Sequence, residues 1–221
     1  MLKEFEMSDM GLLKFFLGLE VTQTVNGVFL SQQQYAKNLL SKFGMKNCNP
    51  DVLPMNPNEK LQADDGADKA DETLYRSLVG GLLYLTHTRP DIMFSVSLVS
   101  CFMQSPSKIH FGAARRILRY LSGTVNHGLW YARNKNVELC GFSDSDWAGS
   151  IEDRKSVSGS VFSLGSAMVS WSSKKQVSVA LSSTEAEYIA AASATCQLVW
   201  LRRILKDLGL TQNGASEAGI L

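Results

Sequence analysis

Two aspartates stand at alternate positions in the stretch GFSDSDWAG, residues 141–149. Successive residues of a β-strand point to opposite faces, so Asp144 and Asp146 share a face with Cys140 and Phe142. Two carboxylates about 4 Å apart repel each other by roughly 4 kcal/mol at an effective dielectric constant near 20. Water, hydrogen-bond donors or a divalent cation with oxygen ligands must offset this repulsion. The pair is therefore a candidate cation site, with hydration or hydrogen bonding as the alternatives.

A further acid, Glu187, lies in the stretch SSTEAEYIAAA, residues 182–192. Ser182 and Glu185 fit the Ser-x-x-Glu capping box, which gives Glu185 a structural role at a helix N-terminus. Glu187 lies about 200° further around that helix, and its neighbours on the same side are alanines. An acid on such a packing face is costly unless it is paired or binds a cation. A glutamate that extends into solvent is the alternative, but Glu187 and Asp144 together favour a metal-binding carboxylate pair.

The composition is that of an ordinary folded protein. The 221 residues are 45% hydrophobic and 19% charged, and a formal net charge of +1 means that any nucleic-acid binding needs a local basic face. The four cysteines are scattered without a CxxC pair, which favours reduced thiols over a zinc site. The N-terminal segment lacks the apolar core of a secretory signal, and no apolar run approaches the ~20 residues of a membrane span. We therefore expect an intracellular protein of the cytoplasm or nucleus, with an organelle-encoded copy left open.

The order of local patterns predicts two structural parts with a boundary near residue 135. Two β-rich runs flank the turn dipeptide Asn26-Gly27, and Ser31 is a candidate cap for a helix that ends at Gly44. Residues 46–72 are rich in Asn, Asp and Pro and indicate a linker. Helical patterns follow at 72–86, 90–104 and 107–123, and strand patterns at 127–133, 137–147, 156–165 and 167–173. A last helix runs from Ser182 to about Leu208 in one or two pieces.

Long motifs in both parts resemble a single family. Residues 141–191, from GFSDSDWAG to SSTEAEYIAA, look like the ribonuclease H domain of copia-type retrotransposon Pol polyproteins. The segments LLKFFLGLEV, LSQQQYAKNLLSKFGM, YRSLVGGLLYLTHTRPDI and SPSKIHFGAARRILRYLSGT resemble the same polyprotein downstream of its polymerase palm. The resemblance covers nearly the whole chain, and its motifs stand in the family's order.

The resemblance implies four regions. Residues 1–47 would be the end of the reverse transcriptase palm, with the primer-grip hairpin and its helix, and residues 48–72 a linker. Residues 73–134 would be thumb-like helices, and residues 135–221 the N-terminal part of a ribonuclease H-like domain. The expected fold class is α+β or α/β. A β-hairpin and a helical thumb-like subdomain would be followed by an incomplete ribonuclease H-like mixed sheet with a packed helix.

The family's ribonuclease H chemistry uses four carboxylates and two Mg²⁺ ions, about 3.5–4 Å apart, at an RNA phosphodiester. The resemblance assigns the strand acid to Asp144, with Asp146 less suitable, and the helix acid to Glu187, because EYIA matches the family's Glu-x-x-Ala. The next strand should carry another acid, but the chain ends at Leu221 before it, and Glu217 falls too early. Two carboxylates cannot fix two Mg²⁺ ions, so we expect weak or absent Mg²⁺ binding and no useful hydrolysis.

Polymerase chemistry is expected to be incomplete as well. The family's metal-binding Asp-Asp pair belongs to a hydrophobic hairpin that lies upstream of Met1. The adjacent Asp64 and Asp65 instead lie in the polar linker, where solvated turn residues are the expected reading.

Local basic clusters are the candidates for nucleic-acid binding. Arg115, Arg116 and Arg119 fall within about one helical turn, and Lys174 and Lys175 lie between a strand and the helix that carries Glu187. Such side chains can contact the phosphates of an RNA–DNA hybrid or a primer–template duplex in a salt-dependent way. An ordinary solvated face is the alternative. The four tryptophans, at 130, 147, 171 and 200, are interpreted as core residues.

The sequence thus predicts a fragment of a reverse transcriptase/ribonuclease H polyprotein that is catalytically incompetent and retains weak duplex binding. Its partners would be nucleic acid and the rest of the Pol polyprotein, with no membrane. A segment of a longer active Pol enzyme and a domesticated nucleic-acid-binding module are the alternatives.

Overall fold

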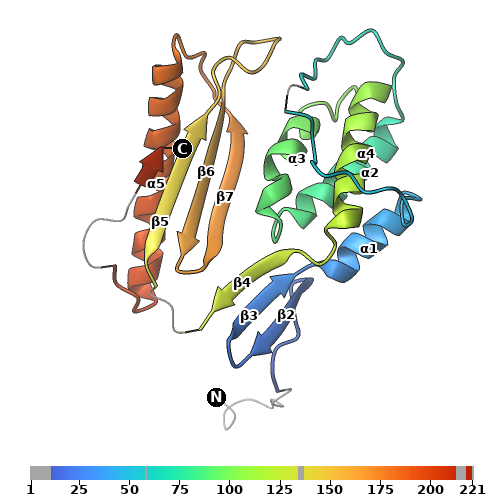
Figure 1. Ribbon diagram of the computed structural model, residues 1–221. Helices are drawn as coiled ribbons and strands as arrows, with labels where there is room; N and C mark the ends of the chain where they lie inside the picture. Colours follow the sequence, from blue (N-terminus) through green and yellow to red (C-terminus); the bar gives the residue numbers. More distant parts are fainter. Residues whose placement is uncertain (1–10, 58, 134–136, 213–217, 221) are drawn as a thin grey trace, which may run out of the picture.

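The structure is a computed structural model that describes residues 11–57, 59–133, 137–212 and 218–220. These residues form two four-stranded sheets, five α-helices and one 3₁₀ helix. Figure 1 shows the first four α-helices together on one side of the molecule and the fifth packed on the second sheet. The predicted mixed class of helices and strands is therefore confirmed.

The N-terminal sheet joins strands that are far apart in the sequence. Its strands are β1 (Phe15–Phe16), β2 (Leu19–Thr24), β3 (Gly27–Ser31) and β4 (Gly128–Ala132), in that order and all antiparallel. The hairpin predicted at Asn26-Gly27 is present. A Cβ atom at Gly27 would overlap the Tyr131 backbone on β4, so a residue without a side chain is needed there. The strand predicted at 127–133 thus pairs with the hairpin.

Ser31 does not cap the first helix, which is a correction to the sequence prediction. Ser31 is the buried last residue of β3, and α1 (Gln33–Lys42) begins after Gln32, whose side chain makes no capping hydrogen bond. The helix ends as predicted, because Gly44 adopts a left-handed φ of +66°.

The other predicted helices of the first part are all present. They are α2 (Glu72–Leu85), the 3₁₀ helix η1 (Pro90–Ile92) with α3 (Met93–Ser100), and α4 (Lys108–Gly123). Asp71 caps α2 by accepting a hydrogen bond from the Leu74 amide, and Ser107 caps α4 by accepting one from the His110 amide. Among its described residues, the predicted linker between α1 and α2 contains no helix, and it forms β-structure only in an isolated bridge between Lys69 and Ser107.

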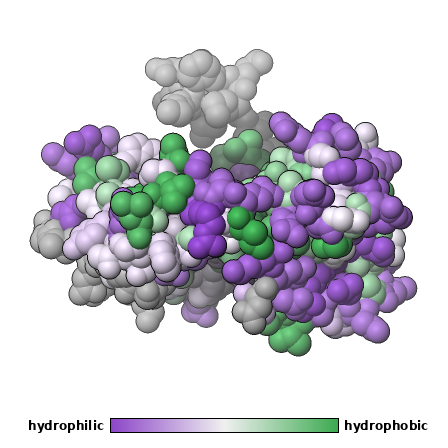
Figure 2. Space-filling model, turned by 90° about the horizontal axis from the view of Figure 1, so that it is seen from above, coloured by the Kyte–Doolittle hydropathy of each residue, from purple (hydrophilic) through white to green (hydrophobic). Residues whose placement is uncertain are grey.

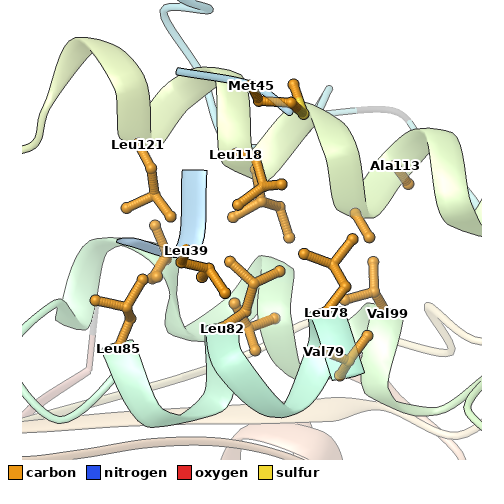
Figure 3. Close-up of a cluster of buried hydrophobic side chains, with 14 of the residues drawn as sticks. Leu39, Met45, Leu78, Val79, Leu82, Leu85, Val99, Ala113, Leu118 and Leu121 are labelled. Atoms are coloured by element: carbon orange, nitrogen blue, oxygen red, sulfur yellow. The ribbon is translucent and has the colours of Figure 1, made fainter. Parts of the chain in front are cut away.

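A single apolar core holds the helical lobe, residues 33–123, together. In Figure 3, Leu39 of α1, Leu78 and Leu82 of α2 and Leu118 of α4 point into one space. The side chains from α2 and α4 are 0% exposed. Fully burying a leucine stabilises a fold by about 1.5–3 kcal/mol, so this layer is the main source of stability in the helical lobe.

The second sheet and its helix form the sheet lobe, residues 137–212 and 218–220. Its strands are β5 (Leu139–Ser145), β6 (Val157–Leu164), β7 (Ala167–Lys175) and β8 (Ala218–Ile220), in the order β7-β6-β5-β8. β5, β6 and β7 are antiparallel neighbours, and β8 lies parallel to β5. The helix α5 (Ser183–Asp207) runs in one piece and ends before Gly209, whose φ is +78°.

The core of the sheet lobe is small and rests on close helix–strand packing. Ala186, Ala190 and Ala194 form the N-terminal part of the buried stripe of α5, and their small side chains let the strands approach. A Cβ atom at Gly141 would lie 2.8 Å from Phe162 and 3.6 Å from Leu198. The buried face of β5 is thus the one that faces α5.

Hydrogen bonds and packing join the two lobes. Trp171 Nε1 on β7 donates to the Thr86 carbonyl (2.9 Å), and the hydroxyls of Ser97 and Ser173 are 3.0 Å apart.

Seen from the end of the sheet at which β5 finishes, hydrophobic residues form separate areas between hydrophilic ones (Figure 2). In the described part of the chain, no helix has the length and apolarity that a membrane span requires.

The expectation that the tryptophans are core residues is wrong for three of the four. Trp130, Trp147 and Trp200 are 40%, 55% and 54% exposed, and Trp171 is half-buried between the lobes. An aromatic ring in a strand or helix pattern does not by itself tell which face of the element is covered.

Candidate functional site

The end of β5 presents Asp144 on the face predicted from the alternation of the strand. Leu139, Gly141 and Ser143 are buried toward α5, whereas Phe142 and Asp144 are exposed on the opposite face. β8 pairs with β5 only as far as Ser143. Beyond that point, no strand among the described residues pairs with this edge of β5.

Asp144 and Glu187 share a hydrogen-bond donor at this edge. The backbone N–H of Ser145 donates to Asp144 Oδ1 (2.9 Å) and to Glu187 Oε1 (3.3 Å). Asp144 comes from β5 and Glu187 from the first turns of α5, so the two elements bring both carboxylates within one hydrogen bond of the same nitrogen. The shared donor offsets part of the repulsion between the two charges.

One buried carboxylate oxygen of this pair has no hydrogen-bond partner among the described residues. This oxygen is Glu187 Oε2. A buried carboxylate oxygen without a donor or a cation is costly. The site therefore has capacity for a cation or a further donor at Glu187.

Glu185 has the structural role that was predicted, with one difference. The Ser182 hydroxyl accepts from the Glu185 amide (3.1 Å), as a cap should. The Glu185 carboxylate accepts from the Leu181 amide (2.7 Å), and not from the Ser182 amide expected for a capping box. Glu187 is therefore the acid of this helix that reaches β5.

Asp146 is engaged by the loop that follows β5. Its Oδ1 accepts from the Val157 amide, and a Cβ atom at Gly149 would overlap its carboxylate. Burial raises the pKa of the Asp146 carboxyl, and the nearby charge of Asp144 adds to the rise, while the Val157 hydrogen bond acts against both. Asp146 thus shapes the turn, and its two oxygens are less free than those of Asp144.

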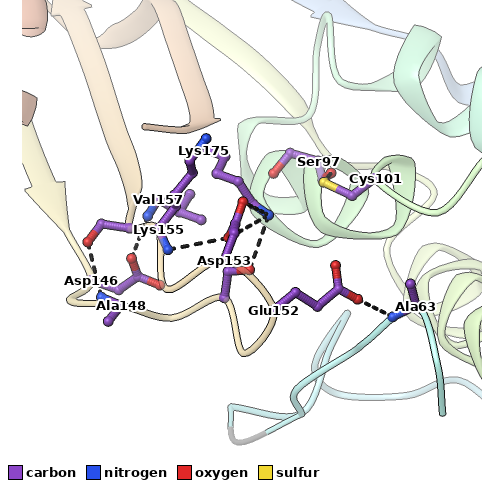
Figure 4. A network of polar contacts seen from close by, with 12 residues as sticks. Ala63, Ser97, Cys101, Asp146, Ala148, Glu152, Asp153, Lys155, Val157 and Lys175 are labelled. Atoms are coloured by element: carbon purple, nitrogen blue, oxygen red, sulfur yellow. Dashed lines mark hydrogen bonds and ion pairs between the residues drawn. The ribbon is translucent and has the colours of Figure 1, made fainter. Parts of the chain in front are cut away.

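The loop between β5 and β6 is anchored on both sides (Figure 4). Lys175 Nζ donates to Asp153 and Ser150, and Glu152 accepts a hydrogen bond from the Ala63 amide of the linker. The hydrogen bond from Ser150, with help from Lys175, lowers the pKa of Asp153 to about 2. Lys175 therefore holds the loop, whereas its neighbour Lys174, which is also exposed, forms no ion pair with the described residues.

The arginine cluster predicted on α4 also contains both side chains that form internal ion pairs and one that does not. Arg119 Nε donates to Asp51 (2.6 Å), and Arg116 lies 3.6 Å from the same carboxylate. The Arg119 hydrogen bond lowers the pKa of Asp51. Arg116 also donates to the Leu53 carbonyl, so both side chains bind the linker to α4. Arg115 is exposed and forms no ion pair within the described residues.

Asp65 is not a solvated turn residue, contrary to the sequence prediction. Its side chain is 9% exposed and accepts hydrogen bonds from the Ser107 hydroxyl and the Ala67 amide (3.0 Å). The Ser107 bond lowers the pKa of Asp65. The neighbouring Asp64 is exposed, as expected.

A cavity of about 540 Å³ opens between the lobes beside Asp144 and Asp146, and Glu187 is not among its lining residues. Asp144 and Asp146 lie on its sheet side together with Phe142 and Trp171, and Phe94 belongs to its helical side. Asp144 thus faces open space rather than a packed neighbour.

Two site residues escaped the sequence prediction, namely Ser145 and Gln176. Ser145 supplies the amide that both acids share, and the side chain of Gln176 donates to the Ser145 hydroxyl (3.1 Å). The available signal was position alone, because Ser145 stands between the two aspartates and Gln176 directly follows the last strand before α5.

The donor chemistry of Asp144 and Glu187 fits a hard divalent cation, which prefers carboxylate oxygens and water. The unpartnered Glu187 Oε2 supports this fit. Within the described ranges there is no group of three or more His, Cys, Asp or Glu side chains that could hold a metal. The protein part of such a site therefore consists of two carboxylates.

Comparisons with known proteins agree with the sequence resemblance. The family model "Reverse transcriptase (RNA-dependent DNA polymerase)" matches residues 1–57. The chain is 41% identical to the Retrovirus-related Pol polyprotein from transposon RE1 of Arabidopsis thaliana, over 94% of the chain and 14% of that relative. It is 39% identical to the corresponding polyprotein from transposon TNT 1-94 of Nicotiana tabacum, over 95% of the chain and 16% of that relative.

A shorter relative is similar along most of its own length. An uncharacterized mitochondrial protein of Arabidopsis thaliana is 40% identical over 89% of the chain and 81% of that relative. No solved structure was found that matches the chain. The chain thus spans only about one seventh of the two Pol polyproteins but four fifths of this relative.

Proposed function

Because the chain belongs to the family of copia-type retrotransposon Pol polyproteins, we propose that its sheet lobe is a ribonuclease H-type nucleic-acid-binding unit with half of a cation site. Residues 1–47 would form the end of the polymerase palm, and the helices of residues 73–134 would act as its thumb. The activity is a weak, salt-dependent association with RNA–DNA hybrid, with little or no hydrolysis by this chain.

The observation that carries the proposal is the shared amide of Ser145. Asp144 and Glu187 are the acids that the family resemblance assigns to the reaction, and both accept a hydrogen bond from this one donor. The strand that the family places after the helix has a counterpart in β8, which lies parallel to β5. Both features support a ribonuclease H-type arrangement of the lobe.

A divalent cation held by Asp144 and Glu187 would activate water and stabilise the leaving oxygen at a phosphodiester. The Ser145 amide bonds both carboxylates, and no donor among the described residues competes for Glu187 Oε2. Two protein ligands leave most of an octahedral shell to water. We therefore expect cation binding to be weak and hydrolysis to be slow or absent.

Of the basic side chains proposed for duplex contact, two are free of internal ion pairs in the described structure. Arg115 and Lys174 are exposed, while Arg116, Arg119 and Lys175 are occupied by carboxylates of the linker and the β5–β6 loop. Phosphate contacts add affinity in proportion to the charges that are available. Contact with nucleic acid is thus expected to depend chiefly on Arg115 and Lys174.

The test is the binding and cleavage of a fluorescently labelled RNA–DNA hybrid. Anisotropy should report binding at 50 mM salt that weakens steeply by 200 mM, and replacing both Arg115 and Lys174 by Gln should reduce it. Replacing Arg133, a basic residue next to β4 and outside both clusters, is the matched control. Equal binding by the double variant and the wild type would contradict the proposal.

A second candidate is a segment of a longer, active Pol enzyme, which the 14% and 16% coverage of the Pol relatives favours. Under this alternative the remaining polyprotein supplies further acids to the same site. A Mg²⁺-dependent cleavage assay that compares this chain with a longer Pol product distinguishes the two, because only the longer product should then hydrolyse the RNA strand.

A further inference from the structure

Gln176 lies directly after β7, where the sheet lobe turns toward α5. Its side chain is buried, with 6% of the residue exposed. Its backbone N–H donates to the Ser156 carbonyl (2.8 Å), which fixes the position of its Cα relative to the start of β6. The carboxamide nitrogen finds partners, whereas Oε1 is buried and accepts no hydrogen bond from the described residues.

The carboxamide nitrogen of Gln176 reaches three elements at once. The two N–H groups of Nε2 are shared among three acceptors, namely the Ser158 hydroxyl on β6 (2.8 Å), the Ala186 carbonyl on α5 (2.9 Å) and the Ser145 hydroxyl on β5 (3.1 Å). A carbonyl oxygen can only accept, so the contact with Ala186 fixes which end of the carboxamide faces α5.

Two of these contacts are adjacent to the candidate acids in the chain. Ser145 follows Asp144 and provides the amide that both carboxylates share, and Ala186 precedes Glu187. The side chain of Gln176 therefore bridges the two backbone positions from which the acids project. A change in this bridge would alter the distance between β5 and the first turn of α5.

We propose that Gln176 is a positioning residue. It sets the spacing of Asp144 and Glu187 because its side chain is hydrogen-bonded to both Ser145 and Ala186. This inference rests on the proposed function only in so far as the pair binds a cation. The geometric part of the inference does not depend on cation binding. It states that Gln176 holds the Ser145 backbone N–H in the position from which it bonds both carboxylates.

The type of the residue matters for this role. A shorter carboxamide at position 176 cannot reach all three acceptors, and an apolar residue leaves the Ala186 carbonyl and two hydroxyls without their donor. A glutamate would replace the donor by a third negative charge beside Asp144 and Glu187. Glutamine alone among the acyclic side chains supplies a neutral donor of this length.

Gln197 provides a matched control. It lies on α5, is half-buried, and its Nε2 donates to the Ser170 hydroxyl on β7 (3.3 Å). Gln197→Ala thus removes a glutamine bridge between α5 and the sheet, but one that does not touch Ser145 or Ala186. The effect of Gln197→Ala shows how the lobe responds when it loses a hydrogen bond between helix and sheet away from the two acids.

The experiment compares the wild-type chain with Gln176→Ala, Gln176→Asn and Gln197→Ala. The first readout is the backbone amide resonance of Ser145 in ¹⁵N-labelled protein without metal. We expect both Gln176 variants to move it clearly further than Gln197→Ala does. The second readout is the dissociation constant of Mn²⁺, which should rise about 10-fold or more in the Gln176 variants, as for other residues that orient ligands, and stay near the wild-type value in Gln197→Ala.

The two readouts separate the inference from the proposed function. If the wild type binds no Mn²⁺, the cation site fails, and the Ser145 resonance still decides the role of Gln176. If the Gln176 variants resemble Gln197→Ala in that resonance, the positioning role is overturned, whatever the metal affinity. Gln176→Asn retains a carboxamide and keeps the test valid if Gln176→Ala does not fold.

Discussion

Asp144 and Glu187 accept hydrogen bonds from the same backbone nitrogen, that of Ser145, at 2.9 and 3.3 Å. Because both carboxylates bond one neutral N–H group, their two negative charges lie near each other and neither is neutralised. The repulsion between these two charges raises the free energy of the metal-free site, and a bound cation would reduce it.

Replacing Glu187 by Gln should stabilise the metal-free chain. The substitution keeps an oxygen for the Ser145 amide and removes the charge of a half-buried carboxylate whose buried Oε2 has no partner among the described residues. We expect the free energy of unfolding to rise by about 1 kcal/mol in EDTA, measured by urea denaturation. Glu185→Gln, which changes a capping acid instead, should not stabilise. A loss of stability in Glu187→Gln would show that the carboxylate is structurally satisfied.

The ion pair between Asp51 and Arg119 should keep the linker on α4. Asp51→Asn removes the charge that faces Arg116 and Arg119, so residues 48–57 should become more accessible to proteases. Limited proteolysis followed by mass spectrometry measures the cleavage rate. Asp64→Asn, at an exposed linker position, is the control. Equal rates for both variants would mean that apolar packing alone holds the linker.

The stability of the helical lobe should depend on pH through His110. His110 Nδ1 accepts from the Ser107 amide (2.9 Å), so a proton on Nδ1 breaks this bond at the N-terminus of α4. Burial lowers the pKa of His110, against the attraction of Asp65, while Lys69 adds to the lowering and Glu152 opposes it. A lowered pKa means that the contribution is complete above about pH 6.5 and is lost as the pH falls through the folded-state value.

His110→Gln tests this dependence, because glutamine preserves the capping-box pattern without titrating. The wild type should lose thermal stability between pH 7 and pH 5 more steeply than the variant, in melts followed by circular dichroism. Parallel pH profiles would assign the loss to carboxylates such as Asp65 instead.

Trp171→Phe should loosen the contact between the lobes. It removes the hydrogen bond from Nε1 to the Thr86 carbonyl but keeps an aromatic ring. A cost of about 1 kcal/mol is expected, together with less cooperative unfolding in calorimetry. Trp147→Phe, which removes an indole bond to the Ala180 carbonyl within the sheet lobe, is the matched variant and should leave cooperativity unchanged.

Local patterns were sufficient to predict most elements of this fold, but not how they pair. The helices around Leu78, Leu118 and Ala190 follow from apolar periodicity and caps, which are local properties. The pairing of β4 with β3 depends on contacts between distant segments, and the sequence alone carries no signal for it. Ser31 shows the same limit. Its residue type favours a helix cap, but pairing with a distant strand places it at the end of β3.

The candidate site was predictable only in its charged members. Asp144 and Glu187 stand out because a carboxylate on a strand or packing face needs an explanation. Ser145 and Gln176 act through a backbone amide and a neutral side chain, which no composition rule marks as unusual. The internal ion pairs of Arg116, Arg119 and Lys175 also required three-dimensional neighbours, since a basic cluster looks alike whether its partners are phosphates or carboxylates.

The most direct test of the cation site is a Mn²⁺ titration followed through the Ser145 amide resonance of the full chain. If Asp144 and Glu187 hold a divalent cation, this resonance should broaden among the first and recover on addition of EDTA, and Glu187→Gln should abolish the effect. Broadening that begins elsewhere, or that persists unchanged in Glu187→Gln, would contradict the account.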